Sequence, residues 1–560
     1  MSNLRLIGAA LGLCAIAASP AACIDHPLKP VEYDSEGVGS GNLPLALNRD
    51  VDILFVIDNS GSMAEEQATL ARNFEQFIAV LERENVAANY RIAITTTDNS
   101  HVSFCTGTGA ESGHFQLQSC LDRASEFIYG NDEHFDEACE SVCELPGLET
   151  SPTPTFEDPE SRARPWIERT GTRTNLPAAV TPAEAFACFG PQGIAGCGFE
   201  STLESMRRAF VRANVEDERS FGFVRPSALL AVVIVTDEED CSARNDPEFA
   251  EVWDPEGNKV FWSEPNRLEP GPTSEVCWFA GVECTGGPGA YDECHPVNRG
   301  IDGEPTDEDH SVLYSVQRYI DFLQGMEDEK REIDSDAEVL VAVIGGVPSG
   351  YDRGEAEIVY RDGVGDDADY QLQVGIGPGC KSAGGLAVPP VRLRAFAEAF
   401  QLGTRPEDRN LYSVCEDDYA PALDEIAELI GRQLRPACMT SCVADTDPTT
   451  PAFDASCTLE EHYEDGDGSG HDLQLPRCEG TGSAPVFPAG AEVCWRILTD
   501  TDPMDDADPT DDMHEQCIAE GWNLQFEVLR TAAGERAGAS SVTADCVVSP
   551  TPSVDCPELG

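Results

Sequence analysis

Residues 51–63 read VDILFVIDNSGSM, and this stretch decides the fold. Its first half, residues 53–57, is too short for a helix and is rich in β-branched and bulky side chains, so it predicts a buried strand. Asp58, Ser60 and Ser62 then place one carboxylate and two hydroxyl groups on a tight turn. A strand that ends in clustered oxygen atoms indicates a site for a hard cation, because Mg²⁺ and Ca²⁺ take oxygen ligands.

A helix is expected directly after this turn. Ser62 and Glu65 have the spacing of a capping box, in which a serine side chain caps the start of a helix. The alternative to a cation site is therefore an ordinary Asn/Ser/Gly turn that joins a strand to a helix.

A second apolar strand with a polar end is predicted at residues 229–235, which are followed by Thr236 and Asp237. Together with the D-x-S-x-S pattern of the first turn, this resembles the von Willebrand factor A family. The metal-ion-dependent adhesion site of that family combines D-x-S-x-S after the first strand with an aspartate, usually as T-D, after a later buried strand. The resemblance covers roughly residues 48–436, with long insertions.

The resemblance implies a site for one divalent cation, Mg²⁺ or Ca²⁺. By this resemblance the two serine hydroxyls bind the ion directly, the two aspartates bind it directly or through water, and one coordination position stays open for an acidic side chain of a partner. The implied ligands are Asp58, Ser60, Ser62 and Asp237.

A further ligand is usually a threonine from the loop before the next helix. The counterpart loop here, at about residues 197–202, offers Glu200, Ser201 and Thr202 instead, with Glu200 and Thr202 as the possible metal ligands. A directly bound Glu200 adds negative charge, which favours Ca²⁺ or weakens the binding of an acidic partner.

Strands and helices alternate along the first three quarters of the chain. Further strands are predicted at residues 90–95, 339–344 and 410–414, and helices at residues 63–86, 201–212, 311–324, 391–400 and 419–434. This order predicts an α/β fold with a doubly wound, mostly parallel sheet of the Rossmann-like type found in the family, in which ligands bind at the carboxyl ends of the strands. The family's strand order places the first strand beside the one that ends at Asp237.

The predicted organisation has four parts. Residues 1–22 have a basic residue, an apolar run and small residues, as in a signal peptide. Cys23 then follows in a setting that resembles a bacterial lipobox, although Pro20 departs from it, and residues 23–47 are predicted to be an anchor cysteine and a flexible tether. The expected parts are completed by a von Willebrand factor A-like domain at 48–437, with disulfide-rich insertions at about 99–181 and 241–307, and a small Cys-rich, β-rich domain at 438–560.

Charge and cysteines indicate the compartment and exclude one class of partner. The chain of 560 residues has a formal net charge of −66, which repels nucleic acid, so no nucleic acid partner is expected. Of its 22 cysteines, an even number remains when Cys14 and Cys23 are set aside, as expected for disulfides in an exported protein. We therefore predict a lipid-anchored protein of the bacterial cell envelope or surface, with simple secretion as the alternative.

Two other acidic stretches are weaker candidates for cation binding. Glu238, Glu239 and Asp240 form either a second shell or second cation site, or an exposed acidic loop. Asp465, Asp467 and Ser469 resemble the start of a calcium loop, but Pro476 stands where the closing glutamate of an EF-hand belongs, so only a simpler calcium-binding turn is considered.

Three functions compete on this reading. The first is a non-enzymatic adhesion protein that binds a protein or extracellular-matrix ligand through the cation. The second is a structural envelope component in which the cation only stabilises the fold. The third is a phosphatase-like enzyme with Asp58 as nucleophile, which is disfavoured because Ser60 replaces the second aspartate that this chemistry needs and no catalytic residue is identified.

Overall fold

The fold is taken from a computed structural model of the chain. The structure describes residues 41–45, 49–83, 86, 88–99, 111–129, 132–155, 157–171, 173–263, 271–331, 337–365, 367–382, 385–434, 437–447, 449, 453–464, 470–479, 486–500, 513, 515–531 and 540–557. The predicted signal peptide, Cys23, and the calcium turn of Asp465, Asp467 and Ser469 lie outside these residues.

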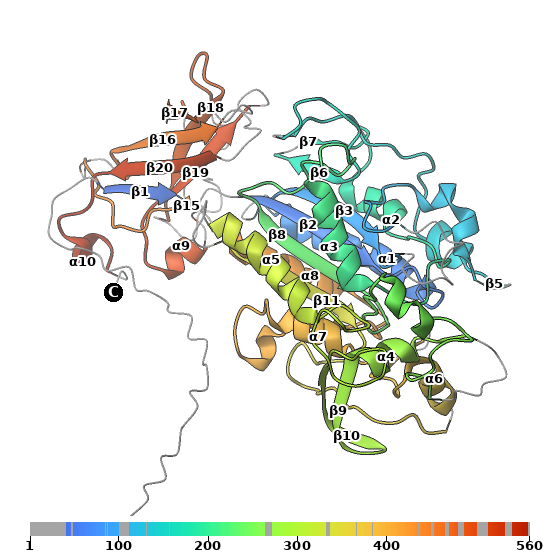
Figure 1. The fold of residues 1–560 in the computed structure, drawn as a ribbon. Helices are drawn as coiled ribbons and strands as arrows, with labels where there is room; N and C mark the ends of the chain where they lie inside the picture. The colour runs from blue at the N-terminus through green and yellow to red at the C-terminus, as the bar shows by residue number, and fades with distance from the viewer. Residues whose placement is uncertain are drawn as a thin grey trace, which may run out of the picture. The chain divides into compact units, whose positions relative to one another are not determined.

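A seven-stranded sheet forms the centre of the larger part of the protein, in the order β14-β11-β8-β2-β3-β6-β7 (Figure 1). The first five strands in this order are parallel to one another, whereas β6 and β7 are antiparallel additions at one edge. Their bounds are β2 Asp50–Ile57, β3 Asn89–Thr96, β6 Ile167–Thr170, β7 Arg173–Thr174, β8 Leu229–Val235, β11 Val339–Gly345 and β14 Leu411–Ser413. The mostly parallel α/β sheet is thus confirmed, as is the neighbouring position of β2 and β8.

Helices cover both faces of this sheet, which explains why its central strands are apolar on both sides. Alternate side chains of β2 enter two separate cores: Phe55 packs with α1, α2 and α8, whereas Leu54 packs with α3, α5 and α7. The helices are α1 Ala64–Leu81, α2 Pro182–Phe189, α3 Thr202–Ala213, α5 Val316–Arg331, α7 Val391–Glu398 and α8 Ala420–Gln433.

The predicted capping box at the start of α1 is wrong. The N-cap residue of α1 is Met63 and it makes no side-chain cap hydrogen bond. The Ser62 hydroxyl lies instead 3.3 Å from the Ser60 hydroxyl, so it belongs to the turn and not to the helix.

The two long insertions contain more regular structure than the sequence indicates. Strands β6 and β7, from the first insertion, extend the central sheet beyond β3. Shorter elements of that insertion are η2 Cys120–Asp122, η3 Ala124–Phe127, β4 Ile128–Tyr129, β5 Asp132–Glu133 and η4 Asp136–Glu140. The second insertion forms η5 Pro247–Val252, α4 Glu275–Gly281 and a hairpin of β9 Val282–Gly287 and β10 Ala290–Pro296. Between β11 and α8 lie α6 Asp367–Val374, β12 Cys380–Lys381, β13 Leu386–Ala387 and η6 Pro406–Asp408.

The C-terminal region forms two antiparallel sheets around one apolar core, which includes Leu459, Trp495 and Phe526. One sheet has the order β1-β20-β16-β17 and the other β15-β19-β18. The bounds are β15 Ala437–Cys438, β16 Cys457–Glu464, β17 Gly470–Leu475, β18 Val493–Leu498, β19 Gln525–Arg530 and β20 Ser540–Cys546, with α9 Glu515–Ala519 and α10 Pro552–Asp555.

Strand β1, Gly41–Leu45, corrects the prediction of a flexible tether over residues 23–47. It pairs antiparallel with β20 over its whole length, so this end of the segment is held by main-chain hydrogen bonds. Pro44, the fourth residue of GNLPL, hid the strand from the sequence reading, although proline is tolerated on an edge strand such as β1.

Nine disulfides lie within the described residues, which supports an oxidising compartment outside the cytoplasm. A Cys188–Cys197 bridge, which their spacing allows, does not form, because Cys188 pairs with Cys143. The pairs are 120–139, 143–188, 241–277, 284–294, 380–415, 438–517, 442–556, 457–546 and 478–494.

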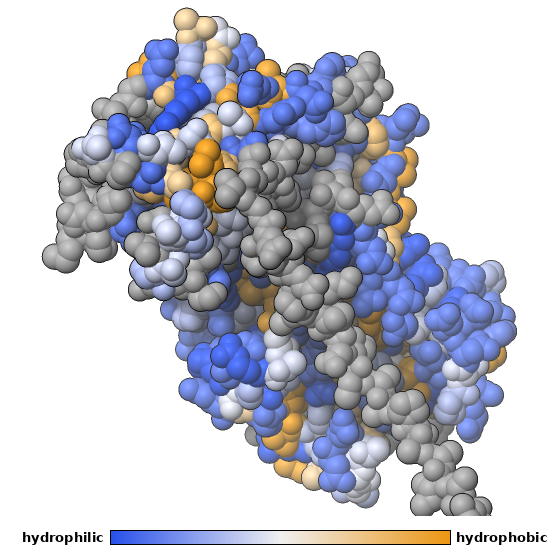
Figure 2. Space-filling view, turned by 90° about the vertical axis from the view of Figure 1, so that its left-hand side faces the viewer, coloured by the Kyte–Doolittle hydropathy of each residue, from blue (hydrophilic) through white to orange (hydrophobic). Residues whose placement is uncertain are grey.

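The described helices include none with the length and apolar character needed to span a bilayer. The face of the molecule drawn in Figure 2 is mainly hydrophilic, with small separate hydrophobic patches. This agrees with the strongly acidic composition of the chain.

Candidate functional site

The carboxyl ends of β2 and β8 lie side by side and bring two polar residues together. The amide of Asp58 donates to the carbonyl of Val235 at 2.9 Å, which extends the ladder between the two strands by one residue. Asp58 therefore lies next to Thr236, whose hydroxyl donates to Asp58 Oδ2 at 2.5 Å. Asp58 is fully buried, and its other oxygen, Oδ1, accepts from the amide of Ser60 at 2.8 Å and from the Thr97 hydroxyl at 3.4 Å.

The turn after β2 places Ser60 and Ser62 next to Asp237, the residue that follows Thr236. Ser60 is buried and Ser62 is exposed, and their hydroxyl oxygens are 3.3 Å apart. The Ser62 side chain also hydrogen-bonds to the carboxylate of Asp237, which is 5% exposed. Asp58, Ser60, Ser62 and Asp237 are thus joined by contacts at one end of the sheet, where the sequence places them.

The loop before α3 adds Glu200 to this group. The amide of Cys241 donates to the carbonyl of Glu200 at 2.7 Å, and the amide of Ser201 donates to the carbonyl of Thr97 at 3.0 Å, which fixes the loop against the ends of β8 and β3. Glu200 is 1% exposed and Thr202 is fully buried. Among the described residues, neither carboxylate oxygen of Glu200 nor the Thr202 hydroxyl has a hydrogen-bond partner.

The acidic run after Asp237 is not an exposed loop, because Glu239 and Asp240 are buried. Glu239 accepts from the amides of Val391 and Arg392, at 2.6 and 3.0 Å, and so caps the N-terminus of α7. Asp240 forms a fully buried ion pair with Arg392 at 3.0 Å and accepts from the amide of Leu203 in α3. The prediction of an exposed loop is therefore wrong for these two residues, whereas a second-shell or second-cation role stays a prediction. Within the run 238–240, Glu238 alone is partly exposed.

The buried carboxylates of the site repel one another. Burial raises the pKa of Asp237 well above its usual value, and Glu238, Asp58 and Glu66 raise it further. Burial also raises the pKa of Glu200 well above its usual value, again with contributions from Asp58, Glu238 and Asp237. Burial raises the pKa of Asp58 too, although its hydrogen bonds from Thr236, Ser60 and Thr97 oppose the shift. No basic side chain is among the main causes of these three shifts.

Buried oxygen atoms without hydrogen-bond partners show whether this cluster suits a divalent cation. In the described part of the chain, no three His, Cys, Asp or Glu side chains form a group arranged to hold a metal ion. The group at the ends of β2 and β8 is of another kind, because two aspartates share it with serine hydroxyls. Both carboxylate oxygens of Glu200, and Oδ1 of Asp237, are buried without a hydrogen-bond partner among the described residues. A buried, unpaired carboxylate is costly, and hard cations take such oxygens, so these residues fit a divalent cation.

The hydrogen bonds by which three further residues support the site were not predicted from the sequence. Thr236 and Thr97 both hydrogen-bond to Asp58 from the ends of the two strands that flank β2. Gln67, in α1, donates to the carbonyls of Asp58 and Gly193 at 2.7 and 2.8 Å and so ties the turn to a distant loop. The register of neighbouring parallel strands is the signal that indicates the threonines, whereas nothing in the sequence indicates the contact of Gln67 with Gly193.

The turn also requires a glycine at position 196, in the same loop as Gly193. The amide of Gly196 donates to the carbonyl of Asn59 at 2.9 Å, and a Cβ at Gly196 would lie 2.4 Å from the side-chain oxygen of Asn59. A larger residue at position 196 would therefore push the loop off the turn.

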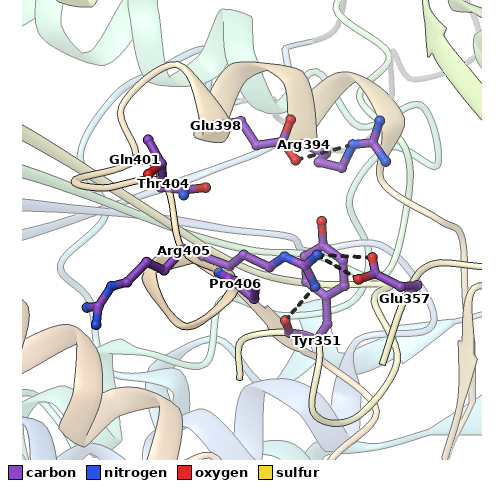
Figure 3. A pocket seen from close by; sticks show the side chains of 9 residues that line it. Tyr351, Glu357, Arg394, Glu398, Gln401, Thr404, Arg405 and Pro406 are labelled. Carbon is purple, nitrogen blue, oxygen red and sulfur yellow. Dashed lines mark hydrogen bonds and ion pairs between the residues drawn. The ribbon is translucent and has the colours of Figure 1, made fainter. Parts of the chain in front are cut away.

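A separate pocket of about 320 Å³ lies beside α7 and η6 and shares no residue with this group (Figure 3). Its charged side chains face one another in pairs: Arg409 binds Glu357 at 2.8 Å, and Arg394 lies 3.6 Å from Glu398. Arg405, which also lines the pocket, pairs with Asp408 outside the lining at 2.8 Å, so each charged lining residue has an ionic partner.

Comparisons with known proteins do not identify a family. No family model matches the chain, and no curated protein matches it. Among solved structures, the pilus adhesin SpaC from Lactobacillus rhamnosus GG in its open conformation is 10% identical, with a TM-score of 0.28 over 90% of this chain and 40% of that one. A second crystal form of SpaC gives 9% identity and a TM-score of 0.27 over the same shares. This chain thus spans about two fifths of that adhesin, and at such TM-scores the likeness carries no argument.

Proposed function

We propose that this chain is an exported protein of the bacterial cell envelope or surface, lipid-anchored at Cys23. Its domain at residues 48–437 is of the von Willebrand factor A type and binds a protein or matrix ligand at the face that carries Asp58, Ser60, Ser62 and Asp237. A divalent cation, Mg²⁺ or Ca²⁺, completes that face. The nine disulfides within the described residues support the location, since they need an oxidising compartment.

One observation carries the cation: both carboxylate oxygens of Glu200, and Oδ1 of Asp237, are buried without a hydrogen-bond partner among the described residues. Burial raises the pKa of Glu200, and the charges of Asp58 and Asp237 raise it further. No basic side chain is among the main causes of this shift, so no positive charge compensates these carboxylates. When bound, a divalent cation supplies that charge and presents an electrophilic centre to a ligand oxygen. We propose binding in place of catalysis because Ser60 stands where the phosphatase-like chemistry needs a second aspartate.

A structural role for the cation is the second candidate, and Glu200 favours it. With Asp58, Asp237 and Glu200 around one divalent ion, the negative charges outnumber the positive ones, so the ion attracts an incoming carboxylate less strongly than an ion held by two aspartates and hydroxyls. In that case the cation stabilises the fold, and a partner binds through other groups of the same face.

Calorimetric titration of the full chain with Ca²⁺ and Mg²⁺, after treatment with EDTA, tests the cation. We expect binding of one ion and a rise in melting temperature, both lost in Asp58→Ala and Asp237→Ala. Matched controls are Asp307→Ala and Asp472→Ala, since both carboxylates are mostly exposed and lie outside the cluster. Absence of heat, together with melting curves that EDTA does not change, would show that no cation binds here.

A further inference from the structure

An exposed aromatic side chain lies directly over the candidate cation turn. Tyr129, in β4, is 60% exposed, and the neighbouring Ile128 is 44% exposed. The Tyr129 ring lies so close to Gly61 that a Cβ on that glycine would lie 2.7 Å from ring carbons. An aromatic and an aliphatic side chain exposed side by side next to a site are typical of an interaction surface.

The surroundings of this turn are acidic on the α1 side. Glu65, in the first turn of α1, is exposed and hydrogen-bonds to Glu137 of η4, whose side chain is 46% exposed. Asp417 is exposed, and its negative charge raises the pKa of the same Glu65 carboxyl. Arg72 acts on Glu65, and His134 lies 3.2 Å from Glu137, so three acidic groups are accompanied by one arginine and one histidine.

The charges closer to the turn have the same sign. With a divalent ion bound, three ionised carboxylates (Asp58, Glu200 and Asp237) would carry one negative charge more than the ion neutralises. A carboxylate from a partner would meet this field on its way to the ion, whereas a guanidinium or ammonium group would be attracted by it.

We infer that this face docks a basic segment of a partner protein, with an arginine or lysine side chain over the exposed face of Tyr129. The face consists of the turn 58–62, Glu65, Ile128, Tyr129 and Glu137. Arginine suits this position because it stacks on an aromatic ring and reaches carboxylates at the same time. The inference rests on the proposed binding function and specifies the chemistry of its partner.

Fluorescence anisotropy with two labelled peptides tests the inference on the full chain. One peptide carries three arginines separated by Gly-Ser, and the other carries glutamate in their place. In Ca²⁺ and 150 mM NaCl we expect the arginine peptide to bind and the glutamate peptide not to bind. Tyr129→Ala should weaken binding of the arginine peptide about two- to fivefold, as expected for loss of an exposed cation–π contact.

Two matched variants separate this contact from general attraction to an acidic protein. Tyr129→Phe retains the ring and should bind like the wild type. Val486→Ala removes an exposed apolar side chain of the C-terminal region and should have no effect. Raising NaCl to 500 mM should weaken binding of all variants but preserve the difference between Tyr129→Ala and the wild type, because diffuse charge attraction is screened more than a direct contact.

Three results would overturn the inference. They are no binding of the arginine peptide at 1 mM, equal binding by Tyr129→Ala and wild type, or tighter binding of the glutamate peptide that EDTA abolishes. The last result would leave the proposed cation function intact and show that an acidic group is the ligand. Failure of the calorimetric cation titration, by contrast, would count against the proposed function itself.

Discussion

At the scale of single residues, Glu200 decides the character of the candidate site. A threonine at this position would offer a neutral hydroxyl, whereas Glu200 places a buried carboxyl close enough to Asp58 and Asp237 that they raise its pKa. It is buried, and neither of its oxygens has a partner among the described residues. Such a group destabilises the fold when no cation is present and stabilises it when one is bound.

Glu200→Gln should therefore have opposite effects in EDTA and in Ca²⁺. Without the ion, at a pH above the raised pKa of Glu200, replacing its repelled carboxylate with a neutral amide should stabilise the fold by about 1–3 kcal/mol. With Ca²⁺, the gain in melting temperature should be smaller than in the wild type, because a charged ligand is lost. Scanning calorimetry under both conditions measures this, with the exposed Glu251→Gln as control. A variant that is less stable in EDTA would contradict the assignment.

At the scale of elements, the loop after β8 connects the site to two helices. Asp237 faces the turn of β2, Glu239 caps α7, and Asp240 binds Arg392 of α7 and the start of α3. The acidic run thus positions the helices around the site, which explains why its last two members are buried.

Loss of Arg392 should damage this loop severely. In Arg392→Met the carboxylate of Asp240 stays buried without its ionic partner, and we expect a loss of about 3–5 kcal/mol in unfolding free energy. Denaturant unfolding followed by circular dichroism measures it. Arg405→Met, which breaks an exposed pair with Asp408, should have little effect. The double variant Arg392→Met/Asp240→Asn should recover part of the loss, because the buried charge is removed while a side-chain oxygen still accepts from the Leu203 amide. Failure to recover would show that the arginine acts in another way.

Much of this arrangement follows from the sequence, and the reasons differ by element. The strands at residues 53–57 and 229–235 are uninterrupted apolar runs, and their ends bring Asp58 and Asp237 together because neighbouring parallel strands end at one edge. The roles of Glu239 and Asp240 were not predictable, since they depend on Arg392, about 150 residues further along the chain. Strand β1 was missed because its pairing partner, β20, is at the other end of the chain.

At the scale of the whole molecule, a net charge of −66 makes stability depend on how carboxylates are neutralised. Most acidic side chains lie at the surface, where water and salt screen them. A few are buried close to the candidate site, and these have raised pKa values. Burial, the largest cause in each case, raises the pKa of Glu66 to about 7 and those of Glu238 and Glu239 to about 8.

The cation-free protein should therefore lose stability as the pH rises from 5 to 8. A carboxyl group whose pKa is higher in the folded than in the unfolded chain gives the folded state extra protons; its contribution is complete below the unfolded pKa of about 4.5 and is lost as pH rises through 7 to 8. Melting temperatures in EDTA at 150 mM NaCl should thus be lower at pH 8 than at pH 5. Saturating Ca²⁺ should reduce or reverse this trend, because the ion replaces the protons, and Glu239→Gln should flatten it in EDTA. A melting temperature in EDTA that rises between pH 5 and pH 8 would show that these carboxylates are stabilised in their charged form by the fold alone.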